Sequence, residues 1–233
     1  MVPVVSVEPS PQVRQLQDRE DAGRKLAAQL ERYRPASPLV LGIPRGGVPV
    51  AYEIARRLDC ELDVLLVRKV GAPGDPEYGL GAVAEGGVVV VDERRTRLAG
   101  FTRTDLEPTV RRELEEVRSR AVRYRGDRAP PEIADRTVIV VDDGVATGGT
   151  VATAISVVRP RRPRLIVAAL GVASPEAVAQ LGELAEDVVV ALVPSFLEAV
   201  GQWYRNFDPV DDRTVVRLLQ SAWSRASGAP RRG

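Results

Sequence analysis

Short runs of apolar residues alternate along this chain with longer segments whose apolar residues recur at helical spacing. The apolar runs predict strands at residues 39–43, 62–67, 137–141, 165–170 and 188–193. The helical spacing predicts helices at residues 18–33, 48–58, 148–158 and 175–184. Runs that are apolar throughout are typical of parallel strands covered on both faces. The alternation therefore predicts an α/β fold with a central, mainly parallel sheet flanked by helices.

The middle of the chain follows a different pattern. Residues 71–81 are rich in glycine and proline and too long for a simple turn, which favours a mobile functional loop. Residues 82–91 predict a hairpin that turns at Gly86 and Gly87. Residues 105–125 predict a largely solvated helix, because opposite charges stand three or four positions apart.

These patterns divide the chain into four parts. We expect a flexible N-terminal arm over residues 1–15 and a core over residues 16–193. A small hood with a C-terminal helix is expected over residues 194–223, and a disordered tail over residues 224–233.

Composition narrows the chemistry of any active site. Histidine is absent and Cys60 is the single cysteine, which excludes zinc sites, Ser-His-Asp triads, Cys-His pairs and an internal disulfide. Catalysis would therefore depend on carboxylates, Lys, Arg, Tyr, backbone amides or a hard metal held by oxygen. Lysine occurs only at Lys25 and Lys69, a bias that either coding composition or heat adaptation could produce.

Charge and hydropathy bear on partners and location. The chain has 33 Lys and Arg against 32 Asp and Glu, with the signs mixed, so we expect no nucleic-acid partner. The N-terminus lacks a basic segment followed by an apolar core, and no apolar run approaches membrane-spanning length. We expect a cytoplasmic protein with no membrane partner.

The segment most suggestive of chemistry is residues 138–150. An apolar strand leads into Asp142 and Asp143, and a glycine-rich loop then enters a helix. The loop consists of Gly144, Val145, Ala146, Thr147, Gly148, Gly149 and Thr150. Glycines allow close backbone approach, and a helix N-terminus favours an anion. The alternative is an ordinary glycine-rich turn after a core strand.

The thirteen residues 138–150 resemble the signature of the type I phosphoribosyltransferases, and differ from nucleotide P-loops and dinucleotide fingerprints. The resemblance implies a Rossmann-like fold with a small C-terminal hood, and phosphoribosyl pyrophosphate as the donor. It implies that Asp142 and Asp143 are catalytic and take the ribose hydroxyls, directly or through Mg²⁺, and that they are the metal ligands. The loop 144–150 would wrap the 5-phosphate.

Two further segments match the family's pyrophosphate side. Residues 43–47 contribute Arg45, Gly46 and Gly47, and resemble a short loop that follows the first strand and often contains a cis peptide bond before a residue other than proline. The alternative is a helix-capping turn with a solvated arginine. Arg68 and Lys69 stand where the family has a second basic contact, although they would also suit a solvated strand end.

The catalytic lid of the family would fall on residues 71–81. Glu77 and Tyr78 are the groups there that could act on a proton or screen the site, so we name Glu77 as a candidate catalytic residue. An ordinary surface turn is the alternative.

Acceptor recognition is expected in the hood. Phe196 and Trp203 are the candidate acceptor-binding residues, in a segment that looks like a distant version of the hood of 6-oxopurine transferases. The alternative is that these aromatics pack the hood itself. The base-reading lysine of purine members is missing from residues 168–174, and the chain instead resembles an uncharacterised branch of the family over residues 18–220.

The resulting hypothesis is a Mg²⁺-dependent phosphoribosyltransferase of nucleotide metabolism. It would move ribose 5-phosphate to a nitrogenous, base-like small-molecule acceptor and release pyrophosphate. The alternative is a non-catalytic sensor that only binds phosphoribosyl pyrophosphate. A phosphohydrolase with Asp142 as nucleophile would require a different spacing between its acidic residues. Oligomeric state stays open, with a homodimer among the choices.

Overall fold

A five-stranded sheet forms the centre of the molecule, in the order β2-β1-β6-β7-β8. The computed structural model describes residues 15–228 of the chain. The strands are β1 (Leu39–Gly42), β2 (Glu61–Val64), β6 (Thr137–Val145), β7 (Leu165–Ala173) and β8 (Asp187–Leu192). All four pairings are parallel, which confirms the predicted sheet.

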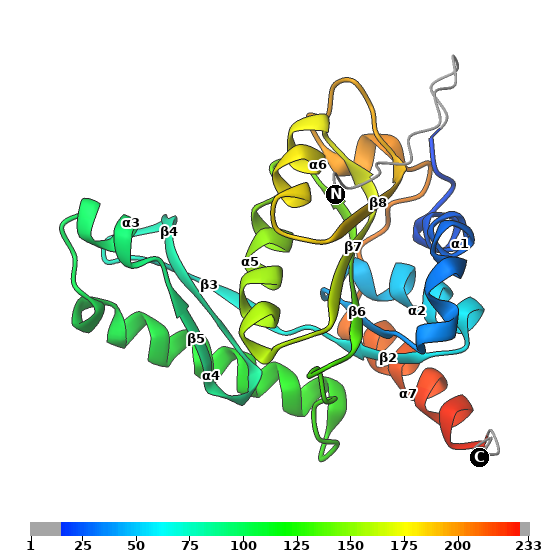
Figure 1. Cartoon of the computed structure of the whole chain (residues 1–233), viewed down its shortest axis with the longest axis horizontal. Helices are drawn as coiled ribbons and strands as arrows, with labels where there is room; N and C mark the ends of the chain where they lie inside the picture. The colour runs from blue at the N-terminus through cyan, green and yellow to red at the C-terminus, as the bar shows by residue number, and fades with distance from the viewer. Residues whose placement is uncertain (1–14, 229–233) are drawn as a thin grey trace.

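Helices cover both faces of this sheet (Figure 1). One face carries α1 (Arg19–Leu30), α2 (Gly47–Leu58) and α7 (Asp212–Gly228), and the other carries α5 (Gly149–Val158) and α6 (Pro175–Gly182). Short 3₁₀ turns lie at η1 (Glu31–Ala36), η2 (Glu85–Gly87), η3 (Arg159–Arg161) and η4 (Val200–Trp203). Alternate strand residues serve the two faces, since Ile139 packs towards α1 and α2 while Val138 and Val140 pack towards α5 and α6. Burial on both sides explains why these strands are apolar throughout.

The chain reverses its direction across the sheet between β1 and β6. From β1 it moves outwards to β2, and later returns to the opposite side of β1 as β6. Gly42 at the end of β1 lies beside Val141 of β6. In open α/β sheets such a switch point opens a crevice beyond the carboxyl ends of the strands, which is where ligands bind.

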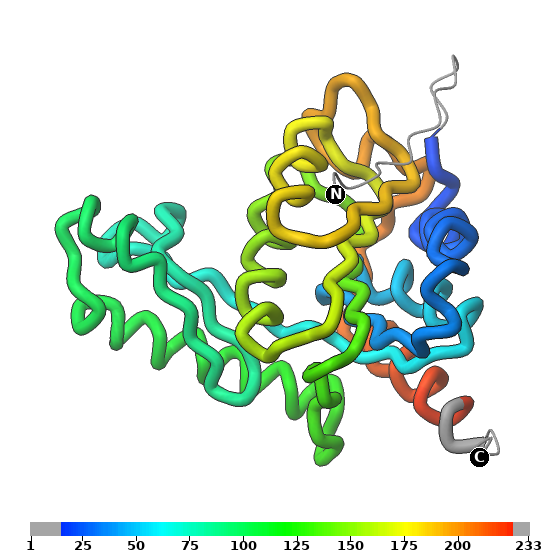
Figure 2. Tube along the Cα trace, viewed as in Figure 1, coloured from blue at the N-terminus to red at the C-terminus, as the bar shows by residue number. Residues whose placement is uncertain are grey.

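Residues 67–125 form an arm that extends away from the central sheet (Figures 1 and 2). The antiparallel strands β3 (Val67–Ala72), β4 (Asp75–Ala84) and β5 (Val88–Val91) are followed by α3 (Glu93–Leu98) and α4 (Arg103–Arg125). The predicted hairpin at residues 82–91 is confirmed, with both Gly86 and Gly87 at φ 76° in the turn. The predicted strand 62–67 is instead split, because β2 ends at Val64 and Val67 begins β3.

The segment 71–81, which we expected to be a mobile functional loop, has regular β-structure over most of its length. It forms most of the β3–β4 hairpin, turning at Pro73 and Gly74, with a register shift near Gly71. A Cβ at Gly71 would lie 2.4 Å from the carbonyl oxygen of Pro76. Gly71 therefore permits close approach of the two strands.

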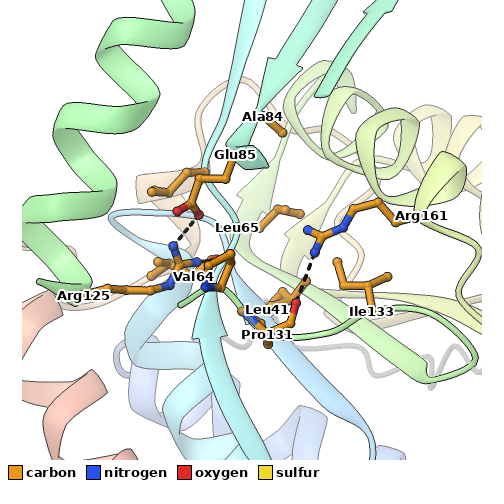
Figure 3. A pocket seen from close by; sticks show the side chains of 11 residues that line it. Leu41, Val64, Leu65, Ala84, Glu85, Arg125, Pro131, Ile133 and Arg161 are labelled. Atoms are coloured by element: carbon orange, nitrogen blue, oxygen red, sulfur yellow. Dashed lines mark hydrogen bonds and ion pairs between the residues drawn. The ribbon is translucent and has the colours of Figure 1, made fainter. Parts of the chain in front are cut away.

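Arg125 at the end of α4 attaches the arm to the sheet (Figure 3). Its Nε donates to Oδ1 of Asp63 at 2.6 Å, Nη2 donates to the carbonyl of Val64 at 2.8 Å, and Nη1 pairs with Glu85. The Arg125 and Asp63 side chains are only 2% and 1% exposed. The adjacent cavity of about 10 Å³ has room for no more than one water, so this junction is structural.

The two ends of the described chain also refine the predicted organisation. Residues 1–14 of the expected N-terminal arm lie outside the described residues, but Leu16 is 1% exposed and forms a β-bridge with Tyr204. Helix α7 continues to Gly228, so residues 224–228 are helical, contrary to the expected disordered tail. The remainder of that tail, residues 229–233, lies outside the described residues. Among helices of the described part, none combines the length and apolarity needed to cross a bilayer.

Candidate functional site

The acid pair lies within the last part of β6, because this strand continues to Val145 rather than ending before Asp142. Asp142 is buried, and its Oδ1 accepts a hydrogen bond from the backbone N–H of Asp143 at 3.0 Å. Burial, followed by the negative charge of Asp143, raises the pKa of the Asp142 carboxyl well above its usual range. The two carboxylates are therefore unequal, and Asp143 is the more accessible.

The loop 43–47 lies directly against Asp143. A Cβ on Gly46 would be 2.0 Å from Oδ2 of Asp143, and one on Gly47 would be 2.5 Å from the carbonyl oxygen of Val141. The peptide bond between Pro44 and Arg45 is cis, as the resemblance implied. The tertiary structure thus brings the candidate pyrophosphate loop and the acid pair together at the switch point.

The glycine-rich loop lies beside this pair, at the N-terminus of α5. Gly148 is the N-cap residue, with φ 76°, and Thr147, Gly149 and Thr150 are exposed. Since the first N–H groups of a helix have no partner within it, this end of α5 can receive an anion.

Not every residue of the predicted loop faces this opening. Val145 is buried in the core, and a Cβ on Gly144 would lie 2.4 Å from Cγ1 of Val200 in η4. Gly144 therefore permits the close approach of the hood, by which we mean residues 194–208. Residues 146–150 remain as the candidate anion site, in which Thr147, Gly149 and Thr150 are exposed and Gly148 is buried.

Arg45 is exposed in the loop 43–47 that follows β1. Its positive charge contributes to the lowered pKa of Asp212, although hydrogen bonds from Tyr124 and Arg123 are the larger causes. Burial, followed by the hydrogen bond to Asp212, raises the pKa of Tyr124 to about 12. Arg45 therefore lies within electrostatic reach of the junction between α4 and α7.

The second basic pair and Glu77 belong to the arm. Nε of Arg68 lies 2.8 Å from Oε2 of Glu113 on α4. Nζ of Lys69 donates to the carbonyl of Glu77 at 3.0 Å and to its carboxylate at 3.1 Å, across the β3–β4 hairpin. The Glu77 side chain is 93% exposed. All three predicted residues therefore lie on the hairpin, where arm carboxylates engage both basic side chains.

The two acceptor candidates differ in environment. Phe196 is 73% exposed in the hood, whereas Trp203 packs against the core and its buried indole N–H has no hydrogen-bond partner among the described residues. The exposed ring of Phe196 suits stacking on a planar ligand, while Trp203 forms part of the hood's own packing.

Tyr204 is a further residue of the site, and it was not predicted from the sequence. This residue is buried, its hydroxyl donates to the carbonyl of Asp143 at 2.5 Å, and its ring stacks on Phe207 at 4.9 Å. Burial raises the pKa of its hydroxyl above the usual range. A Cβ on Gly171 would lie 2.0 Å from this hydroxyl, so β7 carries a glycine where Tyr204 crosses it. The aromatic sequence 203–207 was a signal for a hood, but it did not indicate this contact.

Arg19 was also missed. Its Nε donates to Oδ2 of Asp143 at 2.7 Å and its Nη1 to the carbonyl of Asp208 at 2.8 Å. The guanidinium lies over the Phe207 ring, 3.8 Å from the centroid. The position of Arg19 at the start of α1 gave no sequence signal, since arginines are abundant throughout the chain.

Asp142 and Asp143 are the residues that could hold Mg²⁺. Within residues 15–228 no group of three or more His, Cys, Asp or Glu side chains could hold a metal. Mg²⁺ at phosphate-handling sites is commonly held by one or two carboxylates together with substrate oxygens and water. The acid pair fits that arrangement.

The phosphoribosyl transferase domain profile matches residues 11–188. The chain belongs to the phosphoribosyl transferase domain family. It is 47% identical to the protein in the crystal structure of TT1426 from Thermus thermophilus, with a TM-score of 0.82 over 89% of this chain and 98% of that one. This similarity agrees with the type I phosphoribosyltransferase fold expected from residues 138–150.

Two curated relatives of this family member come from Mycobacterium tuberculosis. The proteins named "Putative phosphoribosyl transferase MT0597" (strain CDC 1551) and "Putative phosphoribosyl transferase Rv0571c" (strain H37Rv) are each 40% identical over 205 residues, or 88% of this chain. The match covers 46% of each relative, so the chain spans about half the length of the curated relatives it matches.

Proposed function

We propose that this chain transfers ribose 5-phosphate from phosphoribosyl pyrophosphate to a nitrogenous, base-like acceptor, with Mg²⁺ and with release of pyrophosphate. The observation that carries the proposal is the approach of Gly46 to Asp143, where a Cβ would lie 2.0 Å from the carboxylate. This approach supports the proposal because it sets the candidate pyrophosphate loop against the acid pair, and the candidate anion site at residues 146–150 follows that pair directly in the chain. The three groups of the donor, pyrophosphate, ribose and 5-phosphate, require that adjacency.

The donor would be held largely by backbone and carboxylate groups. The open N–H groups at residues 146–150 would receive the 5-phosphate, and Asp142 and Asp143 would accept hydrogen bonds from the ribose hydroxyls. The N–H of Gly47 already donates to the carbonyl of Ile43 at 3.0 Å. We therefore assign the pyrophosphate contact to the N–H groups of Arg45 and Gly46 and to the Arg45 guanidinium.

Little covalent chemistry is needed from the side chains. Displacement at the anomeric carbon passes through an oxocarbenium-like state, so positioning and charge stabilisation supply most of the rate. Bound Mg²⁺ would neutralise charge on the departing pyrophosphate. A crevice without histidine suits this reaction.

We propose that the tip of the β3–β4 hairpin closes over the acid pair. In the closed state Glu77 would act on a proton or screen the site from solvent. The Glu77 side chain is almost entirely exposed, and its carboxylate accepts a hydrogen bond from Lys69. Closure would exclude water from the reacting centre, and Arg68 and Lys69 would exchange arm carboxylates for pyrophosphate oxygens.

Acceptor binding is assigned to the hood, with Phe196 stacking on the acceptor. The end of β7 offers no basic group to read a 6-oxopurine, because residues 168–174 contain neither lysine nor arginine, and Tyr204 covers Gly171 there. An acceptor that is held by stacking and by backbone groups fits this surface better than hypoxanthine or guanine.

The deciding experiment is pyrophosphate release from phosphoribosyl pyrophosphate and Mg²⁺ across a panel of nitrogenous acceptors. We expect release that depends on one acceptor class and stops when the metal is chelated. Donor binding without turnover on any acceptor would instead support a sensor. The double variant Asp142→Asn/Asp143→Asn should abolish ribose-phosphate affinity, and retained affinity would overturn the central assignment.

Other expectations stay predictions. These are the cytoplasmic location, the lack of nucleic-acid and membrane partners, and a homodimer. The boundaries of the core and hood also stay predictions.

A further inference from the structure

Arg19 in α1 contacts two parts of the site that are far apart in the chain, Asp143 in β6 and residues 207–208 in the hood. Its Nε binds Oδ2 of Asp143 in β6, its Nη1 binds the carbonyl of Asp208, and its guanidinium lies over the ring of Phe207. The Arg19 and Asp143 side chains are 11% and 14% exposed. Such a sheltered pair is screened much less by salt than a surface pair.

The same carboxylate is confined on its other side. Gly46 lies so close to Oδ2 of Asp143 that no side chain fits between them. The backbone carbonyl of Asp143 accepts from Tyr204, which stacks on Phe207. Asp143 is thus fixed at its side chain by Arg19 and at its backbone by Tyr204.

We propose that Arg19 is a positioning residue, which holds the Asp143 carboxylate in the orientation that receives the ribose hydroxyls and links the ribose subsite to the hood. This inference rests on the proposed function. Arg19 and Gly46 both lie at Oδ2, and a carboxylate has about four lone-pair positions. Oδ1, the oxygen farther from both contacts, therefore remains for the ligand.

The geometry requires arginine rather than any cation. One planar guanidinium bonds in two directions and also presents a face to Phe207. An ammonium group is a point charge on a flexible stem and cannot reproduce that stacked, forked contact. Arg19→Lys should therefore restore function only in part.

If Arg19 positions Asp143, the loss of affinity on removing Arg19 should depend on whether the ligand contains ribose hydroxyls. Removal of Arg19 should weaken ligands that contain ribose hydroxyls and leave inorganic phosphate at residues 146–150 unaffected. Loss of one charge-assisted hydrogen bond corresponds to roughly tenfold or more in affinity. General loosening of the hood or the fold would instead weaken both ligands.

The test is calorimetric titration of wild type, Arg19→Gln and Arg19→Lys with ribose 5-phosphate, with inorganic phosphate, and with phosphoribosyl pyrophosphate plus Mg²⁺. Arg136→Gln is the matched control, because Arg136 pairs with Glu61 at the same 2.7 Å but at the opposite ends of the strands. We expect about tenfold weaker ribose 5-phosphate binding in Arg19→Gln, partial recovery in Arg19→Lys, and no change in Arg136→Gln.

A double-mutant cycle makes the inference specific. In an Asp143→Asn background, Arg19→Gln should have little further effect, because its target carboxylate is already gone. If Arg19→Gln bound ribose 5-phosphate as tightly as wild type or more tightly, the positioning role would be overturned. It would also be overturned if the affinity for inorganic phosphate fell by the same factor as the affinity for ribose 5-phosphate. Wild-type protein that binds neither ribose 5-phosphate nor phosphoribosyl pyrophosphate would instead overturn the proposed function.

Discussion

Replacing Gly46 by alanine tests the close approach of the loop 43–47 to Asp143. Gly46 has φ −64° and ψ −33°, which is ordinary right-handed helical backbone, so alanine introduces no backbone strain. The added Cβ, however, would lie 2.0 Å from Oδ2 and 2.5 Å from Cγ of Asp143. Heavy atoms in contact need about 3.5 Å, so the two must separate by roughly 1.5 Å.

That displacement has a calculable consequence. The Nε of Arg19 holds Oδ2 of Asp143 at 2.7 Å, and a shift of this size breaks a hydrogen bond. Losing a hydrogen bond to a charged group costs about 1.5–3 kcal/mol, and overpacking typically costs about 1–3 kcal/mol. Because the same displacement causes both, we expect about 2–3 kcal/mol of destabilisation and a fall in Tm of about 5–10 °C.

The assay combines thermal unfolding with titration of phosphoribosyl pyrophosphate. Affinity should fall by about tenfold to a hundredfold if misplacing Asp143 costs about 1.4–2.8 kcal/mol of binding. Gly149→Ala is the control for stability, since its Cβ would meet nothing closer than Oγ1 of Thr147 at 3.9 Å and alanine favours the helix. A Gly46→Ala protein with the wild-type Tm and full affinity would refute the reasoning.

Two further predictions concern the arm and the C-terminal helix. Arg125→Met leaves the Asp63 carboxylate buried without its partner and should destabilise the fold by about 3–5 kcal/mol in urea unfolding; a loss below about 1 kcal/mol would contradict the anchoring role. Hydrogen bonds from Tyr124 and Arg123 lower the folded-state pKa of Asp212, so its contribution to stability is complete above the unfolded-state pKa of about 3.9 and is lost as pH falls through the folded value. As the pH is lowered below about 4, the free energy of unfolding should therefore fall less in Asp212→Asn than in wild type. The same pH dependence of unfolding in the two proteins would argue against this linkage.

The strands of the central sheet and the helices that flank it could be predicted from the sequence. Because the sheet is buried on both faces, its strands are apolar throughout, and such runs can be recognised from neighbouring residues alone. Residues 138–141 pack alternately against the helices on the two faces of the sheet. Since both faces are buried, every one of these positions is apolar. The arm was harder, because Gly71 and Pro76 read locally as a loop. Their pairing across the hairpin depends on close backbone contact, which composition does not encode.

Sequence alone determined the parallel α/β sheet, the acid pair with its glycine-rich loop, and the absence of histidine chemistry. Each of these is a property of neighbouring residues or of composition. Only the tertiary structure decided that Gly46 lies against Asp143, that Arg19 pairs with a carboxylate 124 positions away, and that Tyr204 crosses β7 at Gly171. Such contacts depend on the path of the chain around the switch point between β1 and β6, because strands distant in sequence place their ends side by side there.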